Sequence, residues 1–318
     1  MIVLAADLGG TTIKLGLVQG EKLLAFDRIP AQADQPMSGC LERVGACWEA
    51  MLSAAGSRWE DCVAAALAVP FIVAPDNKGV LGDFGKFPGA EHVDFAAWGR
   101  ARLAGLPVLL ENDLRMALLG EAEAGAAKGC DSAVMLALGT GIGCAVLSGG
   151  HLLRGARNRA GTLMGHCSVA FDGLVGRCGN PGCAEDQAST AVLAEQARRR
   201  PDFSRSRLSQ AQSLDYETLF RCADEGDDCS RSLLEHSLRV WASLLLTTVL
   251  AYDPEIVIVG GGVMRRQEFV LPVFRAHLNR HLPAIRADIQ VVAGKLGDQA
   301  ALLGCERFAA ATRPGVLA

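Results

Sequence analysis

Two stretches of the sequence nearly repeat each other: Ala6-Asp7-Leu8-Gly9-Gly10-Thr11-Thr12-Ile13-Lys14-Leu15-Gly16-Leu17-Val18 and Leu136-Ala137-Leu138-Gly139-Thr140-Gly141-Ile142-Gly143-Cys144-Ala145-Val146-Leu147. Each consists of an apolar strand, a tight turn of glycine and threonine, and a second strand rich in β-forming residues. Another glycine turn and a Leu-Leu pair follow each stretch, at 20–24 and at 149–153. The repeat predicts two similar β-hairpins, one in each half of the chain.

Turns of this composition favour phosphate binding. Glycines let backbone N–H groups crowd around an anion, and threonine hydroxyls add donors. The candidate nucleotide-binding residues of the two turns are Gly9, Gly10, Thr11, Thr12, Gly139, Thr140 and Gly141. Asp7 enters the first turn, where a carboxylate can hold Mg²⁺ through water. Two such hairpins facing each other across a cleft would hold a polyphosphate, which predicts an ATP-dependent phosphotransferase.

The other common phosphate motifs do not fit. A Walker loop and a dinucleotide fingerprint both open a helix, whereas the strand at 13–18 runs into Gln19-Gly20-Glu21, which is typical of a hairpin turn. One such hairpin alone is more often ordinary β structure than a phosphate site. The second copy, together with Asp7, favours the phosphate interpretation.

Composition and charge limit the classes of protein that need be considered. The 318 residues are half hydrophobic and 21% charged, with a net charge of −4, which is typical of a soluble two-domain enzyme. The basic runs at 198–200 and 205–207 lie among proline, serine and aspartate, so we expect a solvated loop and no nucleic-acid partner.

No membrane or secretion signal is expected. The apolar start at 1–6 breaks at Asp7, which indicates a strand, and the apolar run at 240–251 is too short to cross a bilayer. Eleven cysteines without a secretion signal indicate a reducing compartment. The sequence therefore predicts a cytoplasmic protein.

Strands and helices are expected to follow one another in a similar order in the two halves. Strands are predicted at 63–69, 80–83, 108–110, 133–138, 256–259 and 289–293, and helices at 38–55, 93–103, 114–127, 191–199, 216–223, 230–251 and 299–311. This order predicts an α/β protein with two similar domains around a central cleft. We expect an N-terminal domain at 1–115, completed by about 294–318, and a C-terminal domain at 116–293.

A polar trio, Glu111-Asn112-Asp113, ends a buried strand immediately before a helix. Ligands of open α/β sheets bind at strand ends, and a carboxylate there can accept the proton of a substrate hydroxyl that attacks the γ-phosphorus. On local pattern alone, Asp113 as the cap of a helix that starts at 114 is the favoured interpretation.

A candidate zinc site follows the second hairpin. His166 precedes Cys178-Gly179-Asn180-Pro181-Gly182-Cys183, a glycine and proline turn between two thiols. Histidine and thiolates around a turn predict zinc, but three ligands are one fewer than a structural site has. Cys167 or water is the candidate for the fourth ligand. A turn with two packed thiols is the alternative interpretation.

Taken together, these motifs resemble the ROK family of sugar kinases, in the superfamily of sugar kinases, heat-shock protein 70 and actin. The resemblance runs from residue 2 to 304. Segments 7–11 and 138–143 are similar to its phosphate motifs, and 259–263, with Gly260, Gly261 and Gly262, to its adenosine loop. Segment 111–126 is similar to the one that carries the family's catalytic aspartate, and 160–185 to its zinc and sugar signature.

The resemblance implies ribonuclease-H-like, actin-like domains and an ATP-dependent kinase that phosphorylates a hydroxyl of a hexose or hexose derivative. It implies Asp113 as the general base, Asn112 and Glu185 as sugar ligands, and His166 as a ligand of both zinc and sugar. The implied cofactors are ATP, Mg²⁺ and a structural Zn²⁺, and the implied assembly is a homodimer or homotetramer.

A non-catalytic sugar sensor is the alternative function, because many ROK relatives are transcriptional repressors. Those relatives carry a helix-turn-helix module in front of the segment that this chain resembles. Here the first strand begins at residue 2, and Asp113 is present. Both features favour the kinase over the sensor.

Three positions depart from the family pattern. Gly176 stands where the family has the first cysteine of a Cys-x-Cys pair, and Leu163, beside Thr162, stands where it has a sugar-binding glutamate. Lys86 replaces an asparagine of the sugar loop. We therefore expect an incomplete zinc shell and a pocket that favours a deoxygenated, acylated or acidic sugar over glucose. If Lys86 instead points to solvent or pairs with Asp83, and Thr162 replaces the glutamate, glucose stays preferred.

Overall fold

The computed structural model describes residues 1–82, 85–173, 175–281 and 289–312. The chain divides into two compact units: Met1–Cys130 with Leu152–Ala160 and Lys295–Ala318, and Asp131–His151 with Gly161–Gly294. The boundary predicted at 115/116 falls inside helix α3 (Asp113–Ala124), which belongs to the first unit. Of the predicted features, Asp83 and the end of the closing segment, 313–318, lie outside the described residues.

The first unit is built on a five-stranded sheet in the order β3-β2-β1-β4-β7. Strands β1 (Ile2–Leu8), β2 (Thr12–Gln19) and β3 (Lys22–Pro30) are antiparallel neighbours, and β4 (Cys62–Val69) and β7 (Val108–Asn112) continue the sheet parallel to β1. Because β1 lies in the middle of the sheet, all its residues are buried, which explains why all of them except Asp7 are apolar.

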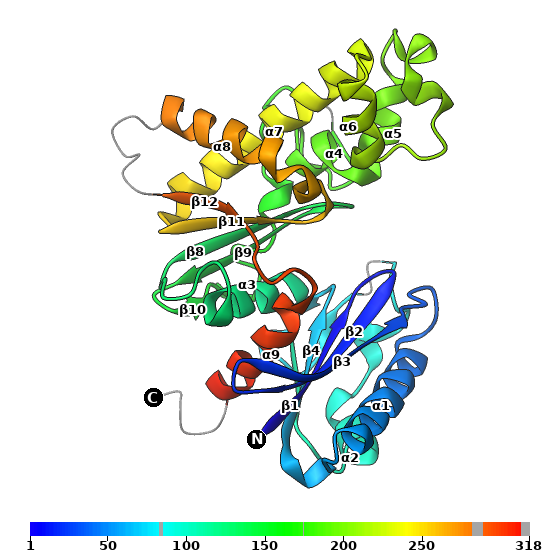
Figure 1. The fold of residues 1–318 in the computed structure, drawn as a ribbon, viewed down its shortest axis with the longest axis vertical. Coiled ribbons are helices and arrows are strands. Elements are labelled where there is room, and N and C mark those ends of the chain that lie inside the picture. Colours follow the sequence, from blue (N-terminus) through cyan, green and yellow to red (C-terminus); the bar gives the residue numbers. More distant parts are fainter. Residues whose placement is uncertain (83–84, 174, 282–288, 313–318) are drawn as a thin grey trace. The chain divides into compact units, whose positions relative to one another are not determined.

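Helices cover both faces of this sheet (Figure 1). Helices α1 (Met37–Ala54) and α2 (Phe95–Arg102) lie on one face, where Trp48 is fully buried and donates a hydrogen bond to the Ala5 carbonyl at 3.2 Å. Helix α9 (Ala300–Ala311) packs on the opposite face against β1, β2 and β4, and also against α3. A two-stranded ribbon, β5 (Ile72–Val73) and β6 (Val80–Leu81), follows β4.

The second unit repeats this sheet. Its order is β10-β9-β8-β11-β12, with β8 (Ala133–Leu138), β9 (Ile142–Ser148) and β10 (His151–Leu152) followed by β11 (Ile256–Gly260) and β12 (Gln290–Ala293). As in the first unit, the hairpin pair is antiparallel, and the two later strands run parallel to the first. The prediction of two similar α/β domains is confirmed.

Among the described residues of the second unit, the α-helices are α4 (Ala184–Ala188), α5 (Thr190–Arg198), α6 (Tyr216–Asp224), α7 (Asp228–Tyr252) and α8 (Gln267–His281). Tyr216 and Trp241 both donate hydrogen bonds to the Ala188 carbonyl, which ties α6 and α7 to the end of α4. The sequence predicts no helix at the position of α8. That helix contains Pro272, which lacks an N–H group and would disfavour a helix on sequence grounds.

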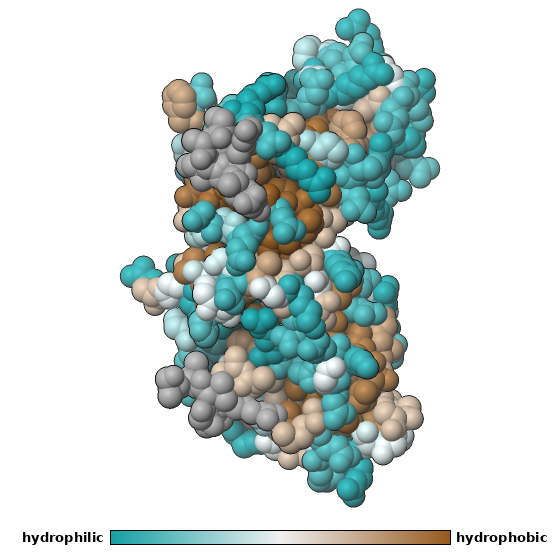
Figure 2. All heavy atoms as spheres, turned by 60° about the vertical axis from the view of Figure 1, so that its left-hand side comes forward, coloured by the Kyte–Doolittle hydropathy of each residue, from teal (hydrophilic) through white to brown (hydrophobic). Residues whose placement is uncertain are grey.

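Among the described residues, α7 is the one helix long and apolar enough, by length and composition, to cross a membrane. The core helix of a soluble protein passes the same test, and 61% of the apolar window of α7 is buried inside the fold. In the view of Figure 2, hydrophilic residues cover much of the surface, with hydrophobic residues exposed between them.

Candidate functional site

The first glycine and threonine turn connects β1 to β2, as predicted for a hairpin. Leu8 pairs with Ile13 across the ladder, so the turn comprises residues 9–12. A Cβ on Gly9 would meet the Thr12 carbonyl oxygen at 2.7 Å, closer than real side chains come, so the turn excludes larger residues there. Residues 9–12 therefore form a tight turn whose backbone can approach a ligand closely.

Asp7, the last polar residue before this turn, is held by a lysine. Its Oδ2 lies 2.9 Å from Lys14 Nζ, across the β1–β2 ladder, and Lys14 also lies 3.2 Å from Asp298 Oδ1. The carboxylate is buried, so it is a fixed negative charge at the edge of the turn. A carboxylate in this position fits the usual Mg²⁺ arrangement of one or two carboxylates, several waters and substrate phosphates.

Asp113 begins helix α3 at the carboxyl end of β7. The helix cap is Asn112, whose Oδ1 accepts from the Leu114 and Arg115 N–H groups at 3.1 and 3.3 Å. The expectation that Asp113 caps a helix from 114 is therefore corrected: the helix starts one residue earlier, and its cap is Asn112. Asp113 Oδ1 accepts a further hydrogen bond from Leu114 N–H at 2.8 Å.

The Asp113 carboxyl has a raised pKa of about 6. Burial is the largest cause and the negative charge of Asp7 is the second, while the Leu114 N–H group, Lys86 and Asn112 lower the value. A carboxyl with a pKa near the operating pH is well matched to proton abstraction. The strand end thus carries a half-buried carboxylate whose pKa is raised toward neutral pH.

Lys86 is half-buried and extends toward the first turn. A Cβ on Gly10 would lie 3.4 Å from Lys86 Cε and 3.6 Å from its Nζ. Its positive charge also lowers the pKa of Asp113. Lys86 therefore lies beside Gly10 and acts electrostatically on the carboxyl of Asp113.

The second turn, residues 139–141 between β8 and β9, is fixed by the polar segment that follows the hairpin. Glu185 Oε2 accepts a hydrogen bond from Ile142 N–H at 2.7 Å, and a Cβ on Gly141 would meet the same oxygen at 2.6 Å. Glu185 thus braces the second turn, a contact that the sequence analysis does not predict.

The glycines at the end of β11 lie against β8, the first strand of the second hairpin. A Cβ on Gly261 would overlap with the Leu138 backbone, and its φ of 91° is a conformation that favours glycine. Next to Gly262 is a cavity of about 600 Å³, with Phe220, Val263 and Arg266 in its lining. Its volume lies in the range of small-molecule sites.

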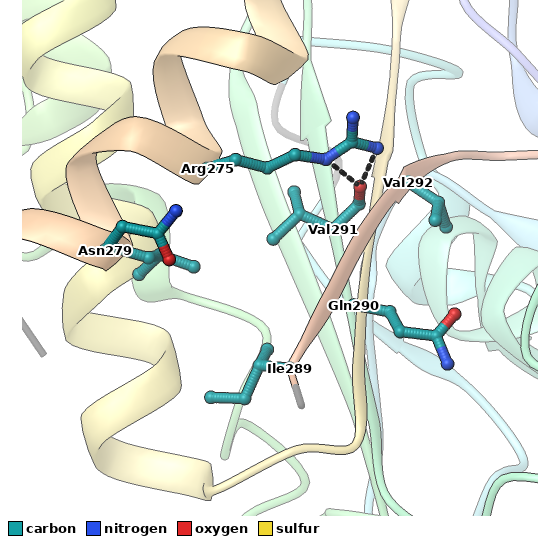
Figure 3. Close-up of a pocket in the computed structure, with 7 residues that line it drawn as sticks. Arg275, Asn279, Ile289, Gln290, Val291 and Val292 are labelled. Carbon is teal, nitrogen blue, oxygen red and sulfur yellow. Dashed lines mark hydrogen bonds between the residues drawn. The ribbon is translucent and has the colours of Figure 1, made fainter. Parts of the chain in front are cut away.

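A second pocket, of about 350 Å³, lies between α8 and β12 (Figure 3). Arg275 of α8 donates two hydrogen bonds to the Val291 carbonyl beside it. None of the predicted nucleotide, sugar or zinc residues lines this pocket. It is therefore separate from the candidate site.

The three predicted zinc ligands come together. One donor atom from each of His166, Cys178 and Cys183 lies within 4.8 Å of the other two, and Cys183 Sγ is 3.6 Å from His166 Nδ1. One imidazole nitrogen and two thiols are the donors that zinc prefers. Cys167 lies outside this group, with its thiol directed at Met164 Sδ at 3.8 Å. The residues therefore fit a zinc ion with three ligands from this chain.

The altered sugar positions differ in their surroundings. The Leu163 side chain is 41% exposed, and the Thr162 hydroxyl is buried without a hydrogen-bond partner among the described residues. Neither residue supplies a carboxylate.

Sequence reasoning missed a buried charge network behind the Asp113 strand. Glu111 is fully buried, 3.4 Å from Arg115 Nη1 and 2.6 Å from Arg154 Nη2. Arg115 also donates to Asn158 Oδ1 at 2.7 Å, which ties segment 152–160 to the first unit. The spacing of Glu111 and Arg115 by four residues is a signal for their ion pair, but no local pattern indicates Arg154 or Asn158.

Known proteins resemble the chain over nearly its whole length. The model of the ROK family matches residues 3–312. A glucokinase of Thermotoga maritima is 29% identical over 309 residues, which cover 95% of each chain. The Escherichia coli DNA-binding transcriptional repressor Mlc is 26% identical over 242 residues, covering 75% of this chain and 58% of the repressor.

Among solved structures, a ROK family glucokinase from Streptomyces griseus in complex with glucose and AMPPNP is 28% identical and gives a TM-score of 0.75. The match covers 97% of this chain and 99% of that one. Folds of this kind are those of the actin-like ATPase superfamily, which agrees with the duplicated sheet. With a family match from residue 3 to 312, the chain belongs to the ROK family.

Proposed function

We propose that the protein is an ATP-dependent kinase that transfers a phosphoryl group to a hydroxyl of a hexose or hexose derivative. The observation that carries this proposal is the Asp113 carboxyl, half-buried at a strand end with a raised pKa of about 6. The family membership and the similarity to glucokinases support the same reaction class.

In the proposed reaction Asp113 accepts the proton of the sugar hydroxyl as the hydroxyl oxygen attacks the γ-phosphorus of ATP. Bound Mg²⁺ would neutralise charge on the phosphates, and Asp7 is the residue proposed to hold it through water. The backbone N–H groups of 9–12 bind and orient phosphate oxygens. Lys86, beside Gly10, supplies a positive charge where negative charge develops.

The second unit contributes the remaining nucleotide residues. We propose that Gly139, Thr140 and Gly141 bind phosphate, and that Gly260, Gly261 and Gly262 bind the adenosine, whose base would enter the cavity lined by Phe220 and Val263. In this arrangement each compact unit contributes one phosphate-binding hairpin. Each unit therefore corresponds to one proposed functional domain.

Sugar ligands are proposed from five positions: Lys86, Asn112, Asp113, His166 and Glu185. The Asn112 Oδ1 atom already caps α3, and Glu185 Oε2 already braces the second turn. Asn112 Nδ2 donates one N–H to the Phe71 carbonyl at 3.4 Å, and its second N–H is proposed for a sugar hydroxyl. In Glu185 the proposed acceptor for a hydroxyl is Oε1. This arrangement holds the side chains rigid before the sugar arrives.

The departures at Lys86 and Leu163 bear on the choice of sugar. Leu163 removes an acceptor for sugar hydroxyls, and Lys86 adds a positive charge. A site that hydrogen-bonds hydroxyls discriminates strongly against analogues that leave its groups unpaired. We expect a deoxygenated, acylated or acidic sugar to be used better than glucose.

The zinc site is proposed as structural. His166, Cys178 and Cys183 would hold one zinc ion, and a metal on one imidazole nitrogen would fix the tautomer that the other presents to the sugar. Chelation that removes zinc should loosen the segment that also carries Glu185. The cytoplasmic location and the dimeric or tetrameric assembly stay predictions.

A release assay for ADP over hexoses, N-acetylhexosamines and rarer sugars tests the proposal. We expect sugar-dependent ADP release by the wild type, reduced in Asp113→Asn by about 10²–10⁴ in kcat. Glucose with the highest kcat/KM would contradict the specificity argument alone. Sugar binding without ADP release from any sugar would instead favour the sensor, for which the similarity to Mlc is the supporting observation.

A further inference from the structure

The segment that carries the predicted zinc ligands also contains a buried carboxylate without an assigned role. Asp186 lies on α4, three residues after Cys183, and its side chain is 9% exposed. Its Oδ2 atom is buried and has no hydrogen-bond partner among the described residues. Its Oδ1 atom lies 3.6 Å from the exposed Arg177 guanidinium. A buried carboxylate oxygen without a partner is costly unless a donor or a cation meets it.

The Asp186 side chain fills the space of a missing side chain at position 176. A Cβ on Gly176 would overlap with the Cβ, Cγ and Oδ2 atoms of Asp186. The Gly176 backbone is not in the left-handed region, so the carboxylate is the obstacle to a larger residue there. Position 176 is the one at which the family has a cysteine. A cysteine side chain at position 176 and the side chain of Asp186 therefore cannot both occupy this space.

The same carboxylate lies beside two of the three zinc donors. The thiols of Cys178 and Cys183 both interact with it, as do the backbone N–H groups of Arg177 and Cys178. Its oxygens are not part of the group whose atoms lie within 4.8 Å of one another, so a shared ion requires the carboxylate to turn toward His166 about its side-chain bonds. The thiol of Cys167, the other candidate for the fourth zinc ligand, is directed at Met164 Sδ.

We propose that Asp186 is the fourth zinc ligand and that its carboxylate replaces the thiolate missing at Gly176. The inference rests on the zinc site proposed above. Zinc binds carboxylate oxygen as well as imidazole nitrogen and thiolate, and structural sites have four ligands. One imidazole, two thiolates and one carboxylate also keep three anionic ligands around the ion, as in a shell of one histidine and three cysteines.

Zinc affinity, measured by competition with a chromophoric chelator, tests the role of Asp186. Asp186→Asn keeps the size of the side chain and removes the anionic oxygen. Because loss of even an outer partner of a ligand costs about 10–100-fold in metal affinity, we expect this variant to bind zinc at least about tenfold more weakly. Asp172→Asn, an exposed aspartate of the same segment, and Cys167→Ser are the controls and should bind zinc like the wild type.

Two further measurements, a rescue variant and a cobalt spectrum, test the role of Asp186 even if Asp186→Asn fails to fold. Gly176→Cys combined with Asp186→Ala clears the shared volume and supplies a third thiolate, so it should recover zinc affinity. With Co²⁺, sulfur-to-metal charge-transfer absorption should indicate two thiolates in the wild type and three in the rescue variant.

The outcomes separate this inference from the zinc site itself. Wild-type zinc affinity in Asp186→Asn, or three thiolates in the cobalt spectrum of the wild type, would overturn the role of Asp186 and leave the zinc site standing. A wild-type protein without measurable zinc affinity would overturn both. Neither result bears on the kinase proposal, which the ADP assay tests separately.

Discussion

The carboxyl of Asp113 is expected to determine the acidic limb of the pH profile. Burial first, and then the charge of Asp7, raise its pKa to about 6. A general base acts only when deprotonated, so wild-type kcat/KM should rise with pH through about 6. The residual activity of Asp113→Asn should lack this limb. Steady-state kinetics of both proteins across the acidic pH range measure this rise in kcat/KM. If Asp113→Asn shows the same rise as the wild type, a group other than Asp113 is responsible for it.

The same raised pKa predicts how Asp113→Asn changes stability. A carboxyl whose pKa is higher in the folded than in the unfolded protein lowers the free energy of unfolding as pH rises from about 4 to above 6. Removing the charge should therefore stabilise the protein at neutral pH, by about 1–3 kcal/mol for a half-buried group, and have no effect near pH 3. Urea unfolding at the two pH values tests this. Destabilisation at neutral pH would mean that Asp113 serves the fold rather than the reaction.

Lys86 should also affect the acidic limb of the kcat/KM profile, through its charge and without taking the proton itself. Its ammonium lowers the pKa of Asp113, so Lys86→Met should raise that pKa and move the acidic limb to higher pH. Lys78→Met, at an exposed lysine of the same segment, is the matched control and should leave the limb where it is. If Lys86→Met also leaves it unmoved, Lys86 is not electrostatically coupled to the base in solution.

Helices α3 and α9 cross at two glycines, where the backbones of the two helices come into close contact. A Cβ on Gly120 would overlap with the Ala300 carbonyl, and one on Gly304 with the Met116 carbonyl. Gly304→Ala should therefore push the helices apart and lower the free energy of unfolding by about 1–3 kcal/mol. Gly39→Ala, at an exposed glycine in α1 with open space around it, should be neutral or stabilise by about 0.5–1 kcal/mol.

Urea unfolding of both glycine variants distinguishes close packing from helix propensity. Propensity alone would make both substitutions stabilising, because alanine favours a helix more than glycine does. An equal gain in Gly304→Ala and Gly39→Ala would show that α3 and α9 tolerate a wider separation.

For the whole molecule, nucleotide binding should raise thermal stability. A ligand at 100 times its Kd stabilises the folded protein by about 2.7 kcal/mol. ADP with Mg²⁺ should therefore raise the Tm of the wild type and also that of Asp113→Asn, because the phosphate turns remain intact in the variant. A thermal shift with sugars and none with nucleotide would favour the sensor over the kinase.

The duplicated architecture could be predicted from the sequence because the signal is local and occurs twice. The strand at Ile2–Leu8 is apolar except for Asp7, and its counterpart at Ala133–Leu138 is wholly apolar. Each ends in a glycine and threonine turn that sets the hairpin. Helix α8 was not predictable in the same way, because Pro272 disfavours a helix locally and burial of Phe274 and Leu278 outweighs that preference.

The sequence by itself determined the α/β class, the two glycine and threonine turns, and the candidate zinc ligands His166, Cys178 and Cys183, because each depends on residue types at short spacing. The tertiary structure alone decided how those groups are used. It assigned the helix cap to Asn112, set Lys14 against Asp7, raised the pKa of Asp113 and brought Asp186 into the space beside Gly176. These features depend on burial and on contacts between distant segments, for which a linear sequence carries no periodic signal.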